Sequence, residues 1–488
     1  GAAPTAAPVA AQAPTAAPSA AVAGGGVAGT PAKKPPKGVT LARGEAAYEV
    51  GAVGANARKQ TKVTAITIYN TDPGYRAGRL IAVSSRYICY GVRGGSVRII
   101  HQTTGQRLLQ KGHTTSELAD ICISGDGDTC TLAAVSSNGD LFVWGISIEN
   151  MTEVKATELF RKDGGAQGYA RILWHPTLPL LATGSSGDNA KVSIWKGFAE
   201  GAVPSCQEMP AEHSGAITGL AWVAGAGSGN GMGIASAAAD GKVVLCDGDG
   251  VMQASFSPFG GDAVQSVMVA QPKGQQTPLL ITGSAGNTCI KMWDATGTTC
   301  LHSVTFTAPG TSSKVGPEIF RATVDLDPLS DFVLVANTVT AGSGDSFAVY
   351  SIHLNTEGDS PHFDCMCEFG VVYPVLSCVV CRDNSAEAES DVRQREMHLY
   401  CMQTKAIQQY HLRPDQCCDV APEASSAPLV TMSEPVSTPF SEALRAPEPV
   451  HVAILEPAHI IHKPVAVQAV RAAPLPAKAP TPPPPQDD

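Results

Sequence analysis

Four cysteines in the C-terminal half of the chain have spacings that could serve metal or redox chemistry. Cys378 and Cys381 have the spacing of half a zinc site or of a redox pair. Cys378 lies in the apolar run Val371–Val380, which predicts a strand, and residues three apart in a strand point to opposite faces. Cys365 and Cys367 share a face, so a four-cysteine site stays geometrically conceivable. We favour buried core cysteines over a ligand set, and we predict no metal site.

Three other segments come close to ligand-binding motifs without matching them. Gly225–Gly233 has no register that gives G-x-G-x-x-G, and no helix pattern follows it. Ala239–Val243 lacks the Ser or Thr after lysine that a phosphate-binding loop needs. Asp126–Asp128 lacks the twelfth-position glutamate of a calcium loop and is interpreted as a turn. We therefore predict no catalytic residues and no cofactor, and we expect that the protein is not an enzyme.

The composition excludes two further classes of protein. The 488 residues include 34 Lys and Arg against 44 Asp and Glu, a net charge of −10, which argues against a protein that mainly grips nucleic acid. No apolar run approaches the ~20 residues that cross a bilayer, so we expect no membrane insertion. A basic group of Arg58, Lys59 and Lys62 leaves direct RNA contact open, but we predict that any RNA contact is indirect or weak.

Short apolar runs with period-two patterning fill residues 38–416, separated about every ten residues by clusters of Gly, Asn, Asp and Ser. Leu132–Val135 and Phe332–Val335 are examples. This pattern predicts many short antiparallel strands, and no stretch shows a sustained helical period. A segment of unusual charge density, Arg382–Glu396, is expected to project into solvent.

The two ends of the chain differ from this middle. Residues 1–37 and 417–488 are rich in Ala and Pro, and we predict that both are disordered tails. For the first, a targeting peptide is the alternative, because the segment contains no acidic residue. In the second, Phe440 and Leu444 belong to a short stretch that is a candidate linear motif for docking on a partner.

The strands recur in a unit of about fifty residues. The run Leu141–Gly145 is repeated as Val192–Lys196 and Ile290–Asp294, each with a tryptophan in fourth position. Weaker copies replace the tryptophan, and an N-terminal copy lies at Val97–His101, so seven units result. The residues that we assign as structural anchors, each in the third strand of its unit, are Trp144, Trp195, Cys246, Trp293, Tyr350 and Cys401.

These units resemble WD40 repeats, which implies a seven-bladed WD40-type β-propeller in an all-β fold. In WD40 repeats a histidine, a Ser or Thr and an aspartate form a hydrogen-bonded chain to the tryptophan. His113 and Asp140 match that pattern before Trp144, and His213 and Asp240 match it in a unit without tryptophan. We predict that these four residues mark a partner-binding rim, with hydrogen bonding inside the blade as the alternative for the two histidines.

The run from residue 62 to residue 69 predicts one further strand. It is a candidate to close the ring against the seventh unit. The sequence leaves that closure undecided.

Beyond the repeats, the chain resembles the enhancer of mRNA decapping 4 family, called Varicose in plants. The similarity lies in segments that are peculiar to that family and that follow in the same order, over roughly residues 60–415. Those segments include Gly78–Ser84, Leu108–His113, Arg171–Pro176, Leu280–Gly283, Tyr373–Ser377 and Thr404–Gln408.

The resemblance implies a non-catalytic scaffold of the mRNA decapping complex that promotes 5′ cap removal and mRNA decay. The implied partners are the decapping enzyme, its activator and other processing-body proteins, and the implied location is the cytoplasm and its processing bodies. The resemblance also implies a C-terminal helical region through which family members self-associate, and we do not expect that region within this sequence. The alternative is a WD40-repeat adaptor of another complex, such as a ubiquitin-ligase substrate receptor or a chromatin-associated module. A propeller enzyme is the third hypothesis.

Overall fold

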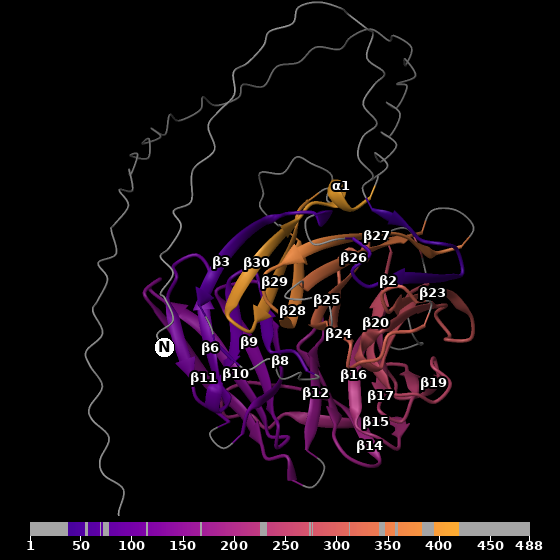
Figure 1. The fold of residues 1–488 in the computed structure, drawn as a ribbon. Helices are drawn as coiled ribbons and strands as arrows, with labels where there is room; N and C mark the ends of the chain where they lie inside the picture. Colours follow the sequence, from indigo (N-terminus) through magenta and orange to yellow (C-terminus); the bar gives the residue numbers. More distant parts are fainter. Residues whose placement is uncertain are drawn as a thin grey trace, which may run out of the picture. The chain divides into compact units, whose positions relative to one another are not determined.

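The computed structural model describes most of the central part of the chain. The described residues are 38–53, 57–68, 70–71, 78–113, 116–165, 168–224, 232–272, 275, 277–311, 313–340, 347–356, 360–382 and 395–418. Within these ranges the strands form seven sheets arranged around a common axis (Figure 1), which confirms the β-propeller. Phe440 and Leu444 lie outside the described residues. The domain boundaries stay predictions.

The first four blades follow one another along the chain, and each runs from its innermost to its outermost strand. Blade one comprises β4 (Ile81–Val83), β5 (Tyr87–Val92), β6 (Ser96–His101) and β7 (Arg107–Gln110). Blade two comprises β8 (Leu118–Ser124), β9 (Thr129–Ser136), β10 (Leu141–Glu149) and β11 (Glu153–Lys162). Blade three comprises β12 (Tyr169–Trp174), β13 (Leu180–Ser185), β14 (Ala190–Lys196) and β15 (Ser205–His213). Blade four comprises β16 (Ile217–Ala224), β17 (Met232–Ala238), β18 (Val243–Cys246) and β19 (Met252–Phe256).

The last three blades also recruit strands from the N-terminal part of the chain. Blade five comprises β20 (Val264–Ala270), β21 (Leu279–Ser284), β22 (Cys289–Trp293) and β23 (Cys300–Thr307), with β2 (Glu45–Glu49) added in parallel. Blade six comprises β24 (Phe320–Leu326), β25 (Phe332–Thr340), β26 (Phe347–Asn355) and β27 (His362–Val371), with β1 (Val39–Thr40) added at its edge. Blade seven comprises β28 (Val375–Arg382), β29 (Met397–Gln403), β30 (Ala406–Leu412) and β3 (Lys62–Ile68). The short helical elements are η2 (Arg93–Gly95), η4 (Ala285–Asn287) and α1 (Pro414–Cys417).

The ring closes through β3, which pairs antiparallel with β30 and forms the outermost strand of blade seven. The N-terminal and C-terminal parts of the propeller therefore share one sheet, and separating them breaks a full ladder of backbone hydrogen bonds. This is the closure for which the sequence offered residues 62–69 as a candidate.

The apolar core lies between neighbouring blades rather than inside any one of them. The buried apolar residues that the structure describes fall into seven clusters, and each joins two adjacent sheets. In the cluster between blades one and two, Tyr87 and Ile99 of one sheet pack with Leu132 and Trp144 of the other. Because each such side chain contributes about 1.5–3 kcal/mol on burial, the stacking of blades is what stabilises the ring and fixes its loops.

Two sequence-based assignments in blade seven need correction. Cys401 lies in β29, the second strand of its sheet, and not in a third strand. The third strand is β30, where Tyr410 is buried three residues after Ile407, as Trp293 lies three residues after Ile290 in β22. The miscount arises because the outer strand of this blade comes from the other end of the chain.

Arg382 also departs from expectation. It is the last residue of β28 and is buried, and its Nη2 lies 2.6 Å from Oδ2 of Asp327 in the neighbouring blade. The beginning of the charged segment is therefore part of the interface between two blades. Residues 383–394 lie outside the described part of the chain. No helix among the described residues is long and apolar enough to cross a membrane.

Candidate functional site

The hydrogen-bonded chain that the WD40 pattern predicts forms where blade three meets blade four. His213, the last residue of β15, places its Nε2 2.9 Å from Oγ of Ser236 and its Nδ1 3.3 Å from the carboxylate of Asp240. Asp240 accepts further hydrogen bonds from the backbone amides of Ser214 (2.9 Å) and Lys242 (3.0 Å). The chain therefore joins the outer strand of blade three to the turn between β17 and β18.

The ionisation of this chain follows from its surroundings. Burial lowers the pKa of His213 although Asp240 opposes the shift, so the ring is neutral at neutral pH. Burial raises the pKa of Asp240, but hydrogen bonds from the backbone outweigh this effect and hold the pKa below its usual range.

The residue after Asp240, Gly241, has a φ of 83°, and a Cβ there would lie 2.3 Å from the carbonyl oxygen of Gly261. The turn is thus fixed both by hydrogen bonds and by close packing.

Blade two does not form the corresponding chain. His113 is 2% exposed, and neither ring nitrogen has a hydrogen-bond partner among the described residues. The ring packs edge-on against Phe142, with centroids 4.5 Å apart, and near Trp144, whose Nε1 also has no partner in the described part of the chain. Burial lowers the pKa of His113 to about 4. Asp140 instead accepts the backbone amide of Gly164 at 2.9 Å.

The other two tryptophan anchors make the hydrogen bond that Trp144 lacks. Nε1 of Trp195 donates to Oγ1 of Thr183 at 3.0 Å, and Nε1 of Trp293 donates to Oγ1 of Thr282 at the same distance. Each bond ties the third strand of a blade to its second strand. The predicted anchors Trp144, Trp195 and Trp293 all lie in third strands.

Cys246 in β18 and Tyr350 in β26 also lie in third strands and are buried. Cys246 has the register position of the tryptophans, since it pairs with Ile234 as Trp195 pairs with Leu181. Both side chains belong to the apolar clusters between blades.

The turns that contain Asp140 and Asp240, residues 137–140 and 239–242, form what we call the rim turns. His113 and His213 are buried beneath them, so the prediction that these two rings contact a partner directly is not supported by their position. The exposed side chains of the rim turns include Asn138 and Lys242. A partner that docks on this rim would contact the exposed side chains of the rim turns, whereas the two histidines pack beneath the turns.

A central cavity of about 560 Å³ is lined mainly by the innermost strands. Arg79 reaches into it and forms a two-pronged ion pair with Asp120, with both N–O distances 3.1 Å. Arg171 donates to the backbone carbonyls of Thr218 and Ala170. Burial raises the pKa of Asp325 to about 6, against the opposing effect of backbone hydrogen bonds. The charges in the cavity therefore hold the inner strands together, and sequence reasoning did not identify them.

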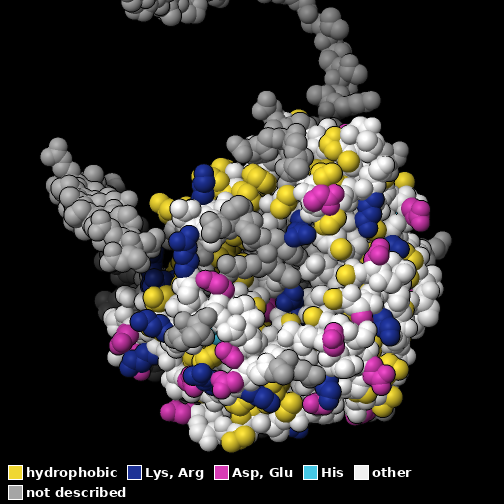
Figure 2. All heavy atoms as spheres, turned by 60° about the horizontal axis from the view of Figure 1, so that its bottom comes forward, with side chains coloured by type: hydrophobic (Ala, Val, Ile, Leu, Met, Phe, Trp, Pro, Cys, Tyr) yellow, Lys and Arg dark blue, Asp and Glu magenta, His cyan; other side chains and the backbone are white. Residues whose placement is uncertain are grey.

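The basic group considered for RNA contact is largely occupied. Arg58 is buried and forms an ion pair with Glu368. Lys59 donates to the carbonyl of Gln416 and lies 3.5 Å from Sγ of Cys367. Figure 2 shows acidic and basic side chains interspersed over the face that it presents. Phosphate binding requires clustered positive charge, whereas Arg58 and Lys59 of this group are engaged with other residues of the propeller.

Comparison with known proteins identifies the family. A sequence model described as the WD40 region of Ge1, enhancer of mRNA-decapping protein, matches residues 57–341, more than half of the chain. The chain belongs to this Ge1 family. The match begins just before β3, the strand that closes the ring, and ends after β25.

Curated relatives extend this similarity. A zebrafish protein (Danio rerio) named Enhancer of mRNA-decapping protein 4 is 24% identical over 454 residues, covering 80% of this chain and 32% of that protein. The human protein (Homo sapiens) of the same name is 24% identical over 423 residues, covering 74% of this chain and 29% of that protein. The chain thus spans about a third of the length of these relatives. A chain of the mitotic checkpoint complex crystal structure is 15% identical, with a TM-score of 0.50, 73% of this chain covered and 94% of that one, and shows the fold alone.

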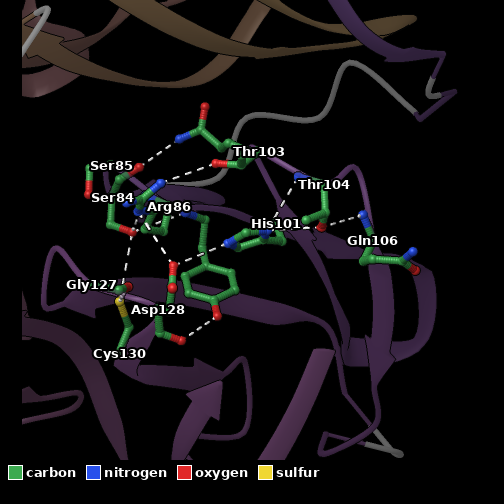
Figure 3. A network of polar contacts seen from close by, with 12 residues as sticks. Ser84, Ser85, Arg86, His101, Thr103, Thr104, Gln106, Gly127, Asp128 and Cys130 are labelled. Carbon is green, nitrogen blue, oxygen red and sulfur yellow. Dashed lines mark hydrogen bonds and ion pairs between the residues drawn. The ribbon is translucent and has the colours of Figure 1, made fainter. Parts of the chain in front are cut away.

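A polar network in blade one of this Ge1-family propeller was not anticipated from the sequence (Figure 3). His101 at the end of β6 and Arg86 in the β4–β5 turn both lie 3.5 Å from a carboxylate oxygen of Asp128. The hydroxyl of Tyr87 donates to the backbone carbonyl of Asp128 at 2.6 Å. Asp128 belongs to the β8–β9 turn, so the Asp126–Asp128 segment is a turn, as predicted, and serves to join blade two to blade one.

The cysteines of the Ge1-family chain group differently from the arrangement considered above. Cys378 and Cys381 lie in β28, while Cys365 and Cys367 lie in β27 and contact the segment around α1. The four thiols do not converge on one point. Among the described residues, two other sets of side chains bring three donor atoms together, His353 with Asp364 and Cys365, and Glu396 with His398 and His411.

Proposed function

We propose that this chain is the propeller portion of a non-catalytic scaffold in mRNA decapping, which binds the decapping enzyme and its activator and thereby promotes 5′ cap removal and mRNA decay. The observation that carries the proposal is the match of residues 57–341 to the Ge1 family, together with relatives that are named enhancers of mRNA decapping. A scaffold needs binding surfaces on a rigid framework, and it needs no catalytic residues.

The geometry suits such a role. Seven interblade cores hold the strands, and the rim turns rest on buried side chains, with the His213–Ser236–Asp240 chain beneath the turn at residues 239–242. A surface that is ordered before binding loses little conformational entropy when a partner docks. We therefore assign partner contact to the exposed residues of the rim turns, with Asn138 and Lys242 as the first to test.

The proposal includes a location and a mode of action on RNA. The expected location is the cytoplasm, in processing bodies, and the expected contact with RNA runs through the partners. The acidic net charge and the occupied Arg58–Lys59 pair support this division of labour. A fluorescent fusion of the chain should co-localise with the decapping enzyme, and diffuse or nuclear fluorescence would contradict the location.

Affinity capture from a cytoplasmic extract tests the proposal. The full chain carries the tag, and bound proteins are identified by mass spectrometry. The proposal predicts that the decapping enzyme or its activator is enriched, and that Asn138→Arg with Lys242→Glu lowers the yield. Asp249→Lys is the matched control, because it lies at the opposite end of β18 from Lys242 and should leave the yield unchanged. Recovery of ubiquitin-ligase or chromatin subunits without decapping factors would refute the proposal in favour of another adaptor role.

A cap-release assay tests the non-catalytic part. The chain alone should release no cap from a capped RNA, whereas adding it to the decapping enzyme with its activator should raise the rate of release. Cap release by the chain alone would contradict the scaffold assignment.

A further inference from the structure

A β-bulge in blade six brings three metal-binding side chains together. His353 in β26 pairs with Cys365 in β27, but the next pair is Leu354 with Phe363, so Asp364 is an extra residue on its strand. In a bulge, two residues of one strand face a single residue of the other, and the side chains are re-aimed. Donor atoms of His353, Asp364 and Cys365 consequently lie within 4.8 Å of one another, with Nδ1 of His353 2.7 Å from Oδ1 of Asp364.

The segment that follows blade seven brings a further cysteine to this part of the molecule. Helix α1 lies against β27, where Sγ of Cys365 donates to the carbonyl of Cys417 at 3.4 Å. The amide of Cys418 closes the helix by donating to the carbonyl of Pro414 at 3.0 Å. The thiol of Cys418 is buried at this end of the helix, with its Sγ 3.9 Å from the carbonyl oxygen of Pro414.

We propose that His353, Asp364, Cys365 and Cys418 bind a zinc ion. Two thiolates, one imidazole and one carboxylate make up a four-ligand set that suits tetrahedral Zn²⁺, and thiolates disfavour Mg²⁺ and Ca²⁺. Donors at Zn–S of about 2.3 Å and Zn–N of about 2.0 Å stand roughly 3.5 Å apart in a tetrahedron. The three bulge donors already lie within 4.8 Å of one another. Cys418 lies outside that group, so its thiol must rotate away from the carbonyl of Pro414 to complete the set. Each cysteine thiol loses its proton to solvent when it binds the ion, and the proton in the hydrogen bond between Nδ1 of His353 and the carboxylate of Asp364 is lost in the same way, which frees both groups to coordinate.

The surroundings support a bound cation with two thiolates. Nδ2 of Asn355 donates to the second carboxylate oxygen of Asp364 at 2.9 Å, which orients that group as second ligand shells do. The ammonium of Lys59 lies 3.5 Å from Sγ of Cys367, next to the proposed site, and offsets the excess negative charge. The side chains of His353 and Asp364 are 21% and 29% exposed, so an ion can enter from solvent.

The position suggests what the ion would do. The site joins β26 and β27 of blade six to the segment that leaves blade seven. Thr40 of β1 pairs with Cys365, and the ammonium of Lys59 donates to the carbonyl of Gln416 in that segment. The N-terminal and C-terminal segments of the propeller meet here. A zinc ion would therefore fasten the C-terminal segment to the ring, as a structural ion with all four positions filled by protein.

The second donor set, Glu396 with His398 and His411, serves as the internal control. His398 and His411 are opposite residues of β29 and β30, and Nε2 of His411 is already 2.9 Å from Oγ1 of Thr64. This set contains no cysteine. It provides a histidine variant, His398→Asn, that removes an equivalent ligand at a different place on the same propeller.

Zinc content measured by mass spectrometry tests the proposal on the full chain, expressed with zinc and purified under reducing conditions. We expect one zinc ion per chain, and we expect His353→Asn and Cys418→Ser each to lose most of it. His398→Asn and Cys206→Ser, an exposed cysteine elsewhere, should retain it. Absence of zinc from the wild-type chain, or equal zinc content in His353→Asn and His398→Asn, would overturn the proposal.

Cobalt spectroscopy covers the case in which a variant folds poorly. Co²⁺ replaces zinc in the wild-type chain, and a tetrahedral site with two thiolates should give intense visible bands and a sulfur-to-cobalt charge-transfer band. Cys365→Ser should weaken the charge-transfer band while the circular dichroism of the β-propeller is retained. Octahedral Co²⁺ spectra in the wild-type chain, or a charge-transfer band of unchanged strength in Cys365→Ser, would overturn the proposal.

Discussion

His113 offers the sharpest quantitative test of the packing described above. The imidazole is 2% exposed, lies edge-on to Phe142 and has no hydrogen-bond partner among the described residues. Burial lowers its pKa to about 4, and the charges nearest to it, Asp140 and Arg161, shift the pKa in opposite directions. The folded protein therefore holds this ring neutral at pH values where the unfolded chain protonates it.

The magnitude follows from linkage. The unfolded chain binds a proton at His113 with a pKa of about 6.5, and the folded protein does so only near pH 4, so the stability that depends on the neutral ring is present above pH 6.5 and falls as the pH falls. Between pH 7 and pH 5 the loss is about 2 kcal/mol, and by pH 4 it reaches about 3 kcal/mol.

Urea denaturation of the wild type and of His113→Leu at pH 7 and pH 5 measures this loss. At pH 7 the variant should be as stable as the wild type or slightly more stable, because leucine replaces a buried ring with unsatisfied nitrogens. Between pH 7 and pH 5 the variant should lose about 2 kcal/mol less than the wild type. His213→Leu is the contrasting variant, since it breaks hydrogen bonds to Ser236 and Asp240 and should destabilise at both pH values. An equal loss in the wild type and His113→Leu would refute the neutral buried ring.

Three further variants, the last of them a double substitution, test other parts of the fold. Arg58→Met leaves the buried carboxylate of Glu368 without its cation. Urea denaturation should show a free energy of unfolding that is lower by about 3–5 kcal/mol. A decrease below about 1 kcal/mol would mean that the ion pair is effectively solvated. Ser236→Ala leaves Nε2 of His213 without a partner and should cost about 1–3 kcal/mol, and an unchanged melting temperature would contradict that bond. Thr64→Pro with Ala65→Pro removes at least one ladder hydrogen bond between β3 and β30. Limited proteolysis should therefore cut the N-terminal segment of this variant faster than that of the wild type. If the variant resists the protease as well as the wild type does, β3 does not close the ring.

The propeller could be predicted from the sequence because each strand and each repeat leaves a pattern in residues that are neighbours along the chain. Period-two runs and a recurring Trp144-type anchor reflect strands that pack against their immediate neighbours along the chain. The one wrong anchor, Cys401, falls where this locality ends, since the fourth strand of blade seven is supplied by residues 62–68. Counting units along the chain cannot reveal that exchange.

The site residues were harder to predict because spacing does not determine hydrogen bonding. His113 and His213 occupy equivalent positions in their repeats, yet only His213 finds a serine and an aspartate in range. In blade two, the rings of Phe142 and Trp144 pack against the histidine instead. Burial of both histidines also moves the candidate binding surface outward, to the rim turns.

The donor set of blade six was beyond sequence reasoning for a different reason. Cys365 and Cys418 are far apart along the chain, and the one-residue bulge at Asp364 leaves no pattern in the sequence. Cys378 and Cys381, whose spacing resembles half a zinc site, lie in the regular strand β28. Residues three apart in a strand point to opposite faces of the sheet.

Isothermal titration calorimetry of the full chain with purified decapping enzyme and with its purified activator tests the central claim most directly. The account predicts saturable binding to at least one of them, weakened by Asn138→Arg with Lys242→Glu and unaffected by Asp249→Lys. Absence of binding to both proteins, with a chain whose circular dichroism shows an intact β-propeller, would contradict it.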